Sequence, residues 1–173
     1  INFCDQEEMD ALKDLDFIPK IGLQFHWENR EYKTFDDYLG AFRSERRNKI
    51  KRERRELYKQ GIRVRALPYD EITPDIQSTL FELYKHHIDS LYYGRQYLNR
   101  RFFDELLKRP YPLICPIVAQ RDDRIIAGTF NIRGPNALYG RYWGAFEDHR
   151  YLHFNVCYYA AIEHCINESL FRF

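Results

Sequence analysis

Most of the residues that could do chemistry lie in one stretch, LYGRYWGAFEDHRYLHFNVCYYAAIEHC at residues 138–165. Its centre, residues 147–155, places two carboxylates and two histidines between an expected strand and an expected helix. Backbone N–H groups at a helix start can bind an anion or a developing oxyanion, and a nearby His153 or Glu147 can act as general base for an amine nucleophile. Because helix starts are polar in any case, a purely structural turn capped by Asp148 or Asn155 is the alternative interpretation.

The expected strand at residues 137–146 supplies a second group of candidates. Because side chains alternate along a strand, we expect Tyr139, Arg141 and Trp143 on one face and Leu138, Tyr142 and Phe146 on the other. The first face would form the floor of a substrate groove in which Arg141 binds an anionic group. Tyr142 and, on the following helix, Tyr159 are further candidate substrate contacts. The alternative is a sheet face that packs under a helix while the arginine extends into solvent.

A run of basic residues, RSERRNKIKRERR at residues 43–55, lies in a helix expected to extend from Phe35 to Gln60. The apolar stripe of that helix includes Arg46, which we expect to reach toward the core or a cleft and to contact substrate. Other basic side chains on its surface would bind the phosphates of RNA or of a nucleotide-bearing donor. The candidate nucleic-acid contacts are Arg43, Arg47, Lys51 and Arg54. A solvated helix face is the alternative.

Histidines elsewhere on helices give weaker signals. His87 lies on the inward face of the helix expected at residues 74–93, where it is either a core residue or a substrate contact at the edge of a cleft. His153 and Cys157 are four residues apart on one helix face, but no third ligand stands at motif spacing. We therefore expect no metal site.

The elements that must position these side chains follow from periodicity and from turn residues. Thr34 is a suitable helix N-cap, Gly61 a suitable helix end and Pro74 a suitable first-turn residue. Helices are expected at residues 5–15, 35–60, 74–93, 99–109 and 152–168, and strands at 62–68, 113–120, 124–133, 137–146 and from 171 onward. Short polar connectors between three of the strands imply an antiparallel meander. The expected fold class is α/β or α+β, with helices covering a mainly antiparallel sheet.

Composition limits the class of protein. The 173 residues are 45% hydrophobic and 17% aromatic, enough for one globular domain, and the formal net charge of +1 excludes a strongly basic protein. The four cysteines form no CxxC pair, which is typical of free thiols in a reducing, cytoplasmic setting. No stretch approaches the roughly 18 consecutive apolar residues of a membrane span.

The same stretches resemble the FemAB-like family of predicted N-acyltransferases, bacterial relatives of the Fem peptidyltransferases within the GNAT superfamily. The resemblance rests on residues 138–166, on FDDYLGAFRSERRNKIKRERREL at 35–57, on QYLNRRFFDELL at 96–107 and on QFHWEN at 24–29. It extends over nearly the whole chain. It implies two GNAT-like lobes in tandem, with residues 1–32 as the tail of a preceding lobe or a flap, and residues 33–173 as a second lobe truncated before its last strands.

The resemblance also implies acyl or aminoacyl transfer to an amine of a small molecule or peptide, with a link to peptidoglycan. No permanently bound cofactor is expected, and the donor is either aminoacyl-tRNA, which the basic helix would suit, or acyl-CoA. Acyl-CoA-binding GNAT domains hold pyrophosphate in a glycine-rich strand-to-helix loop, whereas residues 147–154 contain no glycine. A non-catalytic module of the same fold that binds RNA or a cell-wall peptide is the alternative.

Asn155 departs from the family pattern, because the resemblance predicts a glutamate at this position. It remains a candidate substrate contact. In the predicted site Arg141 orients an anionic part of donor or acceptor, and His153 or Glu147 relays the amine proton. We expect this stretch of chain to lack part of the active-site wall and to be inactive by itself.

Overall fold

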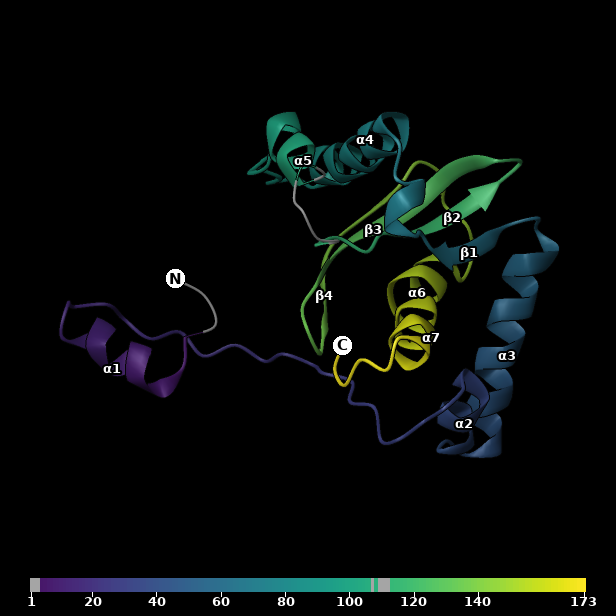
Figure 1. Ribbon diagram of the computed structural model, residues 1–173, viewed down its shortest axis with the longest axis horizontal. Coiled ribbons are helices and arrows are strands. Elements are labelled where there is room, and N and C mark those ends of the chain that lie inside the picture. The colour runs from purple at the N-terminus through teal and green to yellow at the C-terminus, as the bar shows by residue number, and fades with distance from the viewer. Residues whose placement is uncertain (1–3, 107, 109–112) are drawn as a thin grey trace.

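The computed structural model describes residues 4–106, 108 and 113–173. It is an α+β fold in which a four-stranded antiparallel sheet has the order β1-β2-β3-β4 (Figure 1). The strands are β1 (Arg63–Ala66), β2 (Ile117–Arg121), β3 (Arg124–Arg133) and β4 (Leu138–Ala145). The expected fold class and the meander of β2, β3 and β4 are confirmed.

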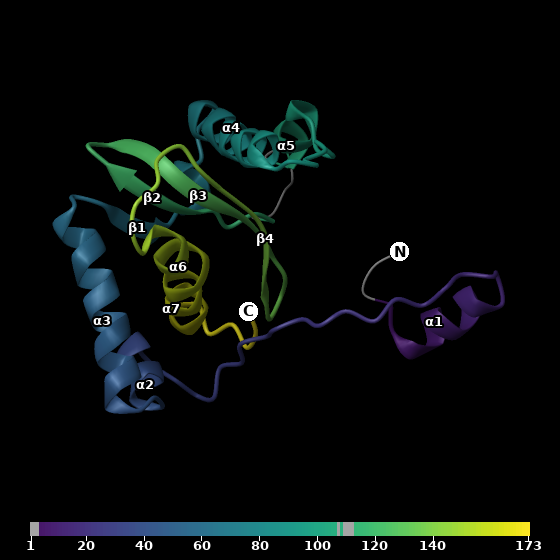
Figure 2. The same cartoon turned by 180° about the vertical axis from the view of Figure 1, so that it is seen from behind.

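Helices cover both faces of this sheet (Figures 1 and 2). On one face lie α4 (Pro74–Ser90) and α5 (Arg100–Leu106), and on the other lie α6 (Leu152–Phe154), the π-helix η2 (Asn155–Tyr159) and α7 (Ala160–Asn167). The remaining elements are α1 (Gln6–Lys13), α2 (Phe35–Gly40), α3 (Ser44–Lys59) and the 3-10 turn η1 (Tyr69–Glu71). Each face of the sheet therefore has its own apolar core.

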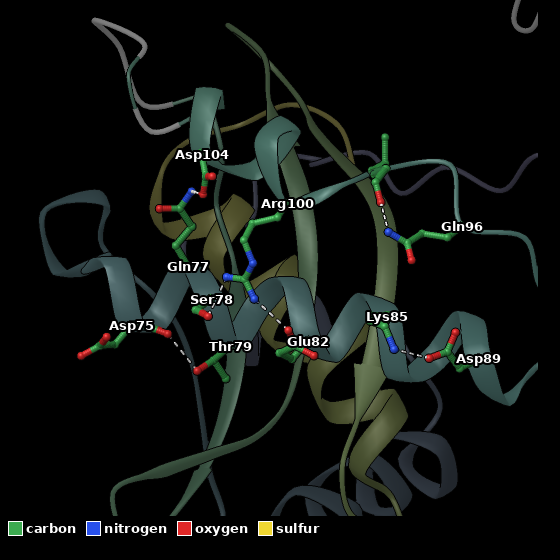
Figure 3. Close-up of polar contacts among 11 residues, drawn as sticks. Asp75, Gln77, Ser78, Thr79, Glu82, Lys85, Asp89, Gln96, Arg100 and Asp104 are labelled. Atoms are coloured by element: carbon green, nitrogen blue, oxygen red, sulfur yellow. Dashed lines mark hydrogen bonds and ion pairs between the residues drawn. The ribbon is translucent and has the colours of Figure 1, made fainter.

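Polar contacts join α5 to α4, and the α4 backbone lies close to the β4 backbone. Arg100 of α5 donates hydrogen bonds to Ser78 Oγ and to Glu82 Oε1 of α4, both at 2.8 Å (Figure 3). At the sheet, a Cβ on Gly144 of β4 would lie only 2.1 Å from the Leu83 carbonyl oxygen of α4. Glycine is therefore required for α4 to lie this close to β4.

The single helix expected over residues 35–60 is wrong, because the structure has two helices there. Thr34 caps α2 as expected, and its Oγ1 accepts a hydrogen bond from the Asp37 N–H at 3.1 Å. The chain then leaves helical geometry at Arg43, with φ −58° and ψ 150°, before α3 begins at Ser44. The helical phase is not continuous across this break, so Arg46, expected to point inward, is exposed.

Strand β4 contains a β-bulge in its middle. Phe130 of β3 pairs with Tyr142, but the next residue, Asn131, pairs with Gly140. Arg141 is therefore an extra residue on β4 with no partner on β3.

The bulge changes which side chains share a face of the sheet. Leu138 and Trp143 both pack into the core under η2 and α7, whereas Tyr142 packs into the core under α4. The expected single face carrying Tyr139, Arg141 and Trp143 is therefore wrong, because one inserted residue inverts the alternation beyond it.

The last three described residues lie between β4 and an N-terminal segment. Arg172 O accepts a hydrogen bond from Leu138 N–H at 2.9 Å, and Phe173 O accepts one from Trp27 N–H at 2.6 Å. Residues 27–29 are thus joined to β4 through residues 171–173, close to the strand start expected there. Helix α1 buries none of its residues and lies apart from the sheet (Figure 1). A lobe boundary at residue 32 stays a prediction.

Two further properties concern the described residues as a whole. None of their helices combines the length and the apolar character that a membrane crossing needs. All four cysteines are free thiols, of which Cys115 and Cys165 are buried.

Candidate functional site

Two hollows open beside β4 and share a wall. The first, of about 830 Å³, lies between β4, residues 24–27 and the helix that follows β4 (the β4 groove). The second, of about 660 Å³, lies between the last turns of α4 and residues 145–154 (the α4 hollow). Trp143 and His153 line both spaces. These two side chains therefore separate the hollows.

The β4 groove brings together the four candidate residues of β4, which are Tyr139, Arg141, Tyr142 and Trp143. Arg141 is exposed, and its Cζ lies 5.6 Å from the centre of the Tyr142 ring. The groove lining, within the described part of the chain, includes no Asp, Glu or Lys. Arg141 is thus its permanent charge, which suits an anionic group of a substrate.

His153 is the histidine best placed for proton transfer. Its ring contacts the Trp143 ring edge-on, with 5.2 Å between ring centres, and the Tyr158 ring at 5.9 Å. Although part of the side chain stays in solvent, burial lowers the pKa of His153, and the nearby His87 lowers that pKa further. His153 is therefore neutral near pH 7 and able to accept a proton.

His87 lies in the α4 hollow, as a partly buried residue at the cleft edge. His86 and His149 line the same space. Even so, no group of three or more His, Cys, Asp or Glu side chains among residues 4–106, 108 and 113–173 is arranged to hold a metal ion.

Glu147 is held in a network at the edge of the α4 hollow. Its Oε2 lies 2.8 Å from His149 Nε2 and 2.7 Å from Arg121 Nη2, while His149 Nδ1 lies 3.2 Å from Gln60 Oε1. The hydrogen bond from His149 and the charge of Arg121 lower the pKa of Glu147. A carboxylate stabilised in this way is a weak base, so the arrangement favours His153 over Glu147 as proton acceptor.

Asn155 holds the turn that begins α6 and lines neither hollow. Its side chain is 5% exposed, and its Nδ2 donates a hydrogen bond to Tyr151 O at 2.8 Å. Tyr151 has a left-handed backbone, with φ 72°, which is costly for a residue with a Cβ. The structure thus places Asn155 in support of a strained turn, away from the substrate spaces where we expected it.

Tyr159 also lies outside both hollows. It is buried, and its hydroxyl donates a hydrogen bond to Glu53 Oε2 of α3 at 2.6 Å. Burial, together with the Glu53 carboxylate, raises the pKa of Tyr159. This hydrogen bond joins η2 to α3. It also provides the buried Glu53 carboxylate with the hydrogen-bond donor that a buried charge requires.

The basic face of α3 is partly neutralised. Lys51 forms an ion pair with Asp36 at 2.8 Å, and Arg54 forms a two-pronged pair with Glu163 of α7, at 2.5 and 3.3 Å. Arg43 and Arg46 are exposed, and Arg47 is partly buried. No residue of this group lines the β4 groove or the α4 hollow. The predicted nucleic-acid surface and the two hollows are thus separate parts of the molecule.

A family profile of FemAB-like proteins, described as peptidoglycan biosynthesis/recognition, matches residues 1–173. The chain belongs to the FemAB-like family. The resemblance of the motifs is thereby confirmed, and family membership connects the chain with peptidoglycan, the polymer of glycan strands and peptides. No curated protein matches the chain.

The β4 groove also contains residues outside the set predicted for the site. Thr129 and Asn131 of β3 line the β4 groove, and His26 lines it from the N-terminal segment. The family resemblance includes His26 in QFHWEN, which was the available signal. Thr129 and Asn131 gave no signal, because their place in the groove depends on the packing of β3 beside β4.

Proposed function

We propose that this FemAB-like chain takes part in the transfer of an acyl or aminoacyl group to an amine of a peptide in peptidoglycan biosynthesis. The observation that carries the proposal is the shared wall of the two hollows, where a neutral His153 lies against Trp143. One substrate occupies each hollow, and the proton acceptor stands between them.

In this mechanism the amine nitrogen attacks the acyl carbon, and a nitrogen–carbon bond forms as the bond from that carbon to the donor oxygen or sulfur breaks. His153 takes the proton from the amine and returns it to the leaving oxygen or sulfur. Arg141 binds an anionic group of donor or acceptor in the β4 groove. These steps do not require a carboxylate in the groove.

For the donor we favour an aminoacyl ester of tRNA over acyl-CoA. Residues 147–154, which line the α4 hollow, contain no glycine, so the hollow lacks the glycine-rich loop that binds a pyrophosphate. Arg43, Arg46 and Arg47 of α3 remain available for the phosphates of an RNA.

A module that recognises a cell-wall peptide without catalysis is the second candidate. The family description, which includes recognition, and the Phe, Tyr and Trp side chains in the lining of the β4 groove favour it. Such a module would bind peptide in the groove without needing a proton acceptor.

The test, made with the full-length protein, is transfer of a labelled acyl group from acyl-CoA and from charged tRNA to a lysine-containing stem peptide. His153→Gln should lower transfer by about 100-fold or more. The matched control is His164→Gln, which makes the same change at a partly buried histidine that lines neither hollow and should leave transfer nearly unchanged. Unaltered transfer in His153→Gln would contradict the mechanism, and peptide binding with no consumption of either donor would support the recognition module.

A further inference from the structure

Asn131 is a buried polar residue at the floor of the β4 groove. Its exposed fraction is 1%, yet it belongs to the lining of the groove. It lies on β3 directly opposite Gly140, beside the bulge at Arg141. Bulges are common next to functional sites, where they change the direction of side chains, so Asn131 is a candidate for a functional role.

Both hydrogens of the Asn131 amide are used inside the protein. Nδ2 donates to Cys115 O at 2.8 Å and to Thr129 Oγ1 at 2.9 Å. Because Cys115 O can only accept, the nitrogen must be the atom that faces it, and the orientation of the amide is fixed. Oδ1 therefore points away from these partners.

Asn131 Oδ1 has no hydrogen-bond partner among the described residues. In the described part of the chain, Trp27 Nε1 is the one side-chain polar atom that has no partner and is also fully buried. Asn131 Oδ1 has no partner either, so it keeps some solvent-accessible surface, and it faces the groove that Asn131 lines. A Cβ on Gly140 would lie 3.8 Å from Oδ1 and 3.4 Å from the Phe173 ring, so the glycine leaves this oxygen without a covering methyl group. A fixed, unpartnered acceptor at the floor of a groove is an arrangement that binds an N–H donor.

We infer that Asn131 Oδ1 is a substrate-binding group that accepts a hydrogen bond from the neutral primary amine of the acceptor. This inference rests on the proposed function and identifies the form of the acceptor that enters the groove. With no Asp or Glu in the described lining and with Arg141 present, the groove favours an uncharged amine over an ammonium ion. The uncharged amine is the nucleophilic form.

The probe is trialanine amide, whose α-amine is largely neutral at about pH 9, compared with its N,N-dimethyl form, whose amine has no N–H when neutral while its amide N–H groups are unchanged. The side-chain NH₂ signal of Asn131 in ¹⁵N-labelled protein should shift with trialanine amide and much less with the dimethyl form. Gly140→Ala, which covers Oδ1 but makes only ordinary contacts with the Phe173 ring, should weaken binding by about tenfold. The control is Gly40→Ala, where a Cβ meets nothing within 4 Å.

An Asn131 signal that trialanine amide leaves unmoved, or equal affinity of the dimethyl form, would overturn the inference. So would wild-type affinity in Gly140→Ala. Measurement of acceptor KM separates this inference from the proposed function. If transfer depends on His153 while Gly140→Ala keeps its KM, only the inference fails. If Asn131 responds but neither donor is consumed, only the transferase proposal fails.

Discussion

Replacement of Asn155 tests whether its amide supports the left-handed turn at Tyr151. In the structure Tyr151 O accepts two hydrogen bonds, one from Asn155 Nδ2 at 2.8 Å and one from the Asn155 backbone N–H at 3.2 Å. Asn155→Ala removes the first bond at a cost of about 1 kcal/mol, because the carbonyl keeps its second partner. The cavity left by the side chain adds about 1 kcal/mol.

Asn155→Asp keeps the shape of the side chain but places a carboxylate against the Tyr151 carbonyl. A buried charge without a partner costs about 3–5 kcal/mol, so this variant should be less stable than Asn155→Ala near neutral pH. Burial raises the pKa of such a carboxyl, and the protonated acid can donate to Tyr151 O. The deficit of Asn155→Asp should therefore shrink as the pH falls, whereas that of Asn155→Ala should not change.

The measurement is urea unfolding followed by tryptophan fluorescence, near neutral pH and at about pH 5, where a raised carboxyl pKa becomes visible. The free energies of unfolding of wild type, Asn155→Ala and Asn155→Asp are compared at each pH. If Asn155→Asp is as stable as Asn155→Ala at neutral pH and its deficit does not depend on pH, the side chain does not face a carbonyl oxygen and our account of the turn is refuted.

Gly144→Ala should lower the free energy of unfolding by about 3 kcal/mol, because its Cβ would overlap the α4 backbone. The matched control is Gly140→Ala, whose melting temperature should stay near that of wild type. Equal melting temperatures of the two variants would disprove the close approach of α4 to β4. Burial raises the pKa of the Cys165 thiol to about 12. The folded state thus keeps a proton that the unfolded chain loses above about pH 8.5, so the stabilisation is complete below that pH and is lost as the pH rises toward 12. Cys165→Ala should reduce the fall in the free energy of unfolding across this pH range. If urea unfolding at several pH values shows the same fall in the variant as in wild type, the thiol is not its source. His87→Gln removes a charge that disfavours protonated His153, so the pKa of His153 measured by NMR titration should rise, and a fall would contradict their coupling.

Local sequence determined the elements of this protein and the stretch that contains most of its site. The N-cap at Thr34, the first-turn Pro74 and the left-handed Gly61 all stand where the sequence places them. These features depend on the backbone and side chain of a few neighbouring residues, which is why the sequence suffices. Tyr139, Arg141, Tyr142 and Trp143 lie within one short stretch of sequence, and all four line the β4 groove.

Tertiary structure alone decided which face each side chain occupies and which distant residues meet. The bulge at Arg141 and the break at Arg43 invert or interrupt a period, and neither has a local sequence signal strong enough to predict it. His87 reaches His153, and Asn131 reaches the groove, only because α4 and β3 pack against β4. Periodicity is a property of a single segment, whereas register and helix placement are set by the fit between segments, so sequence pattern identified the site but could not fix its geometry.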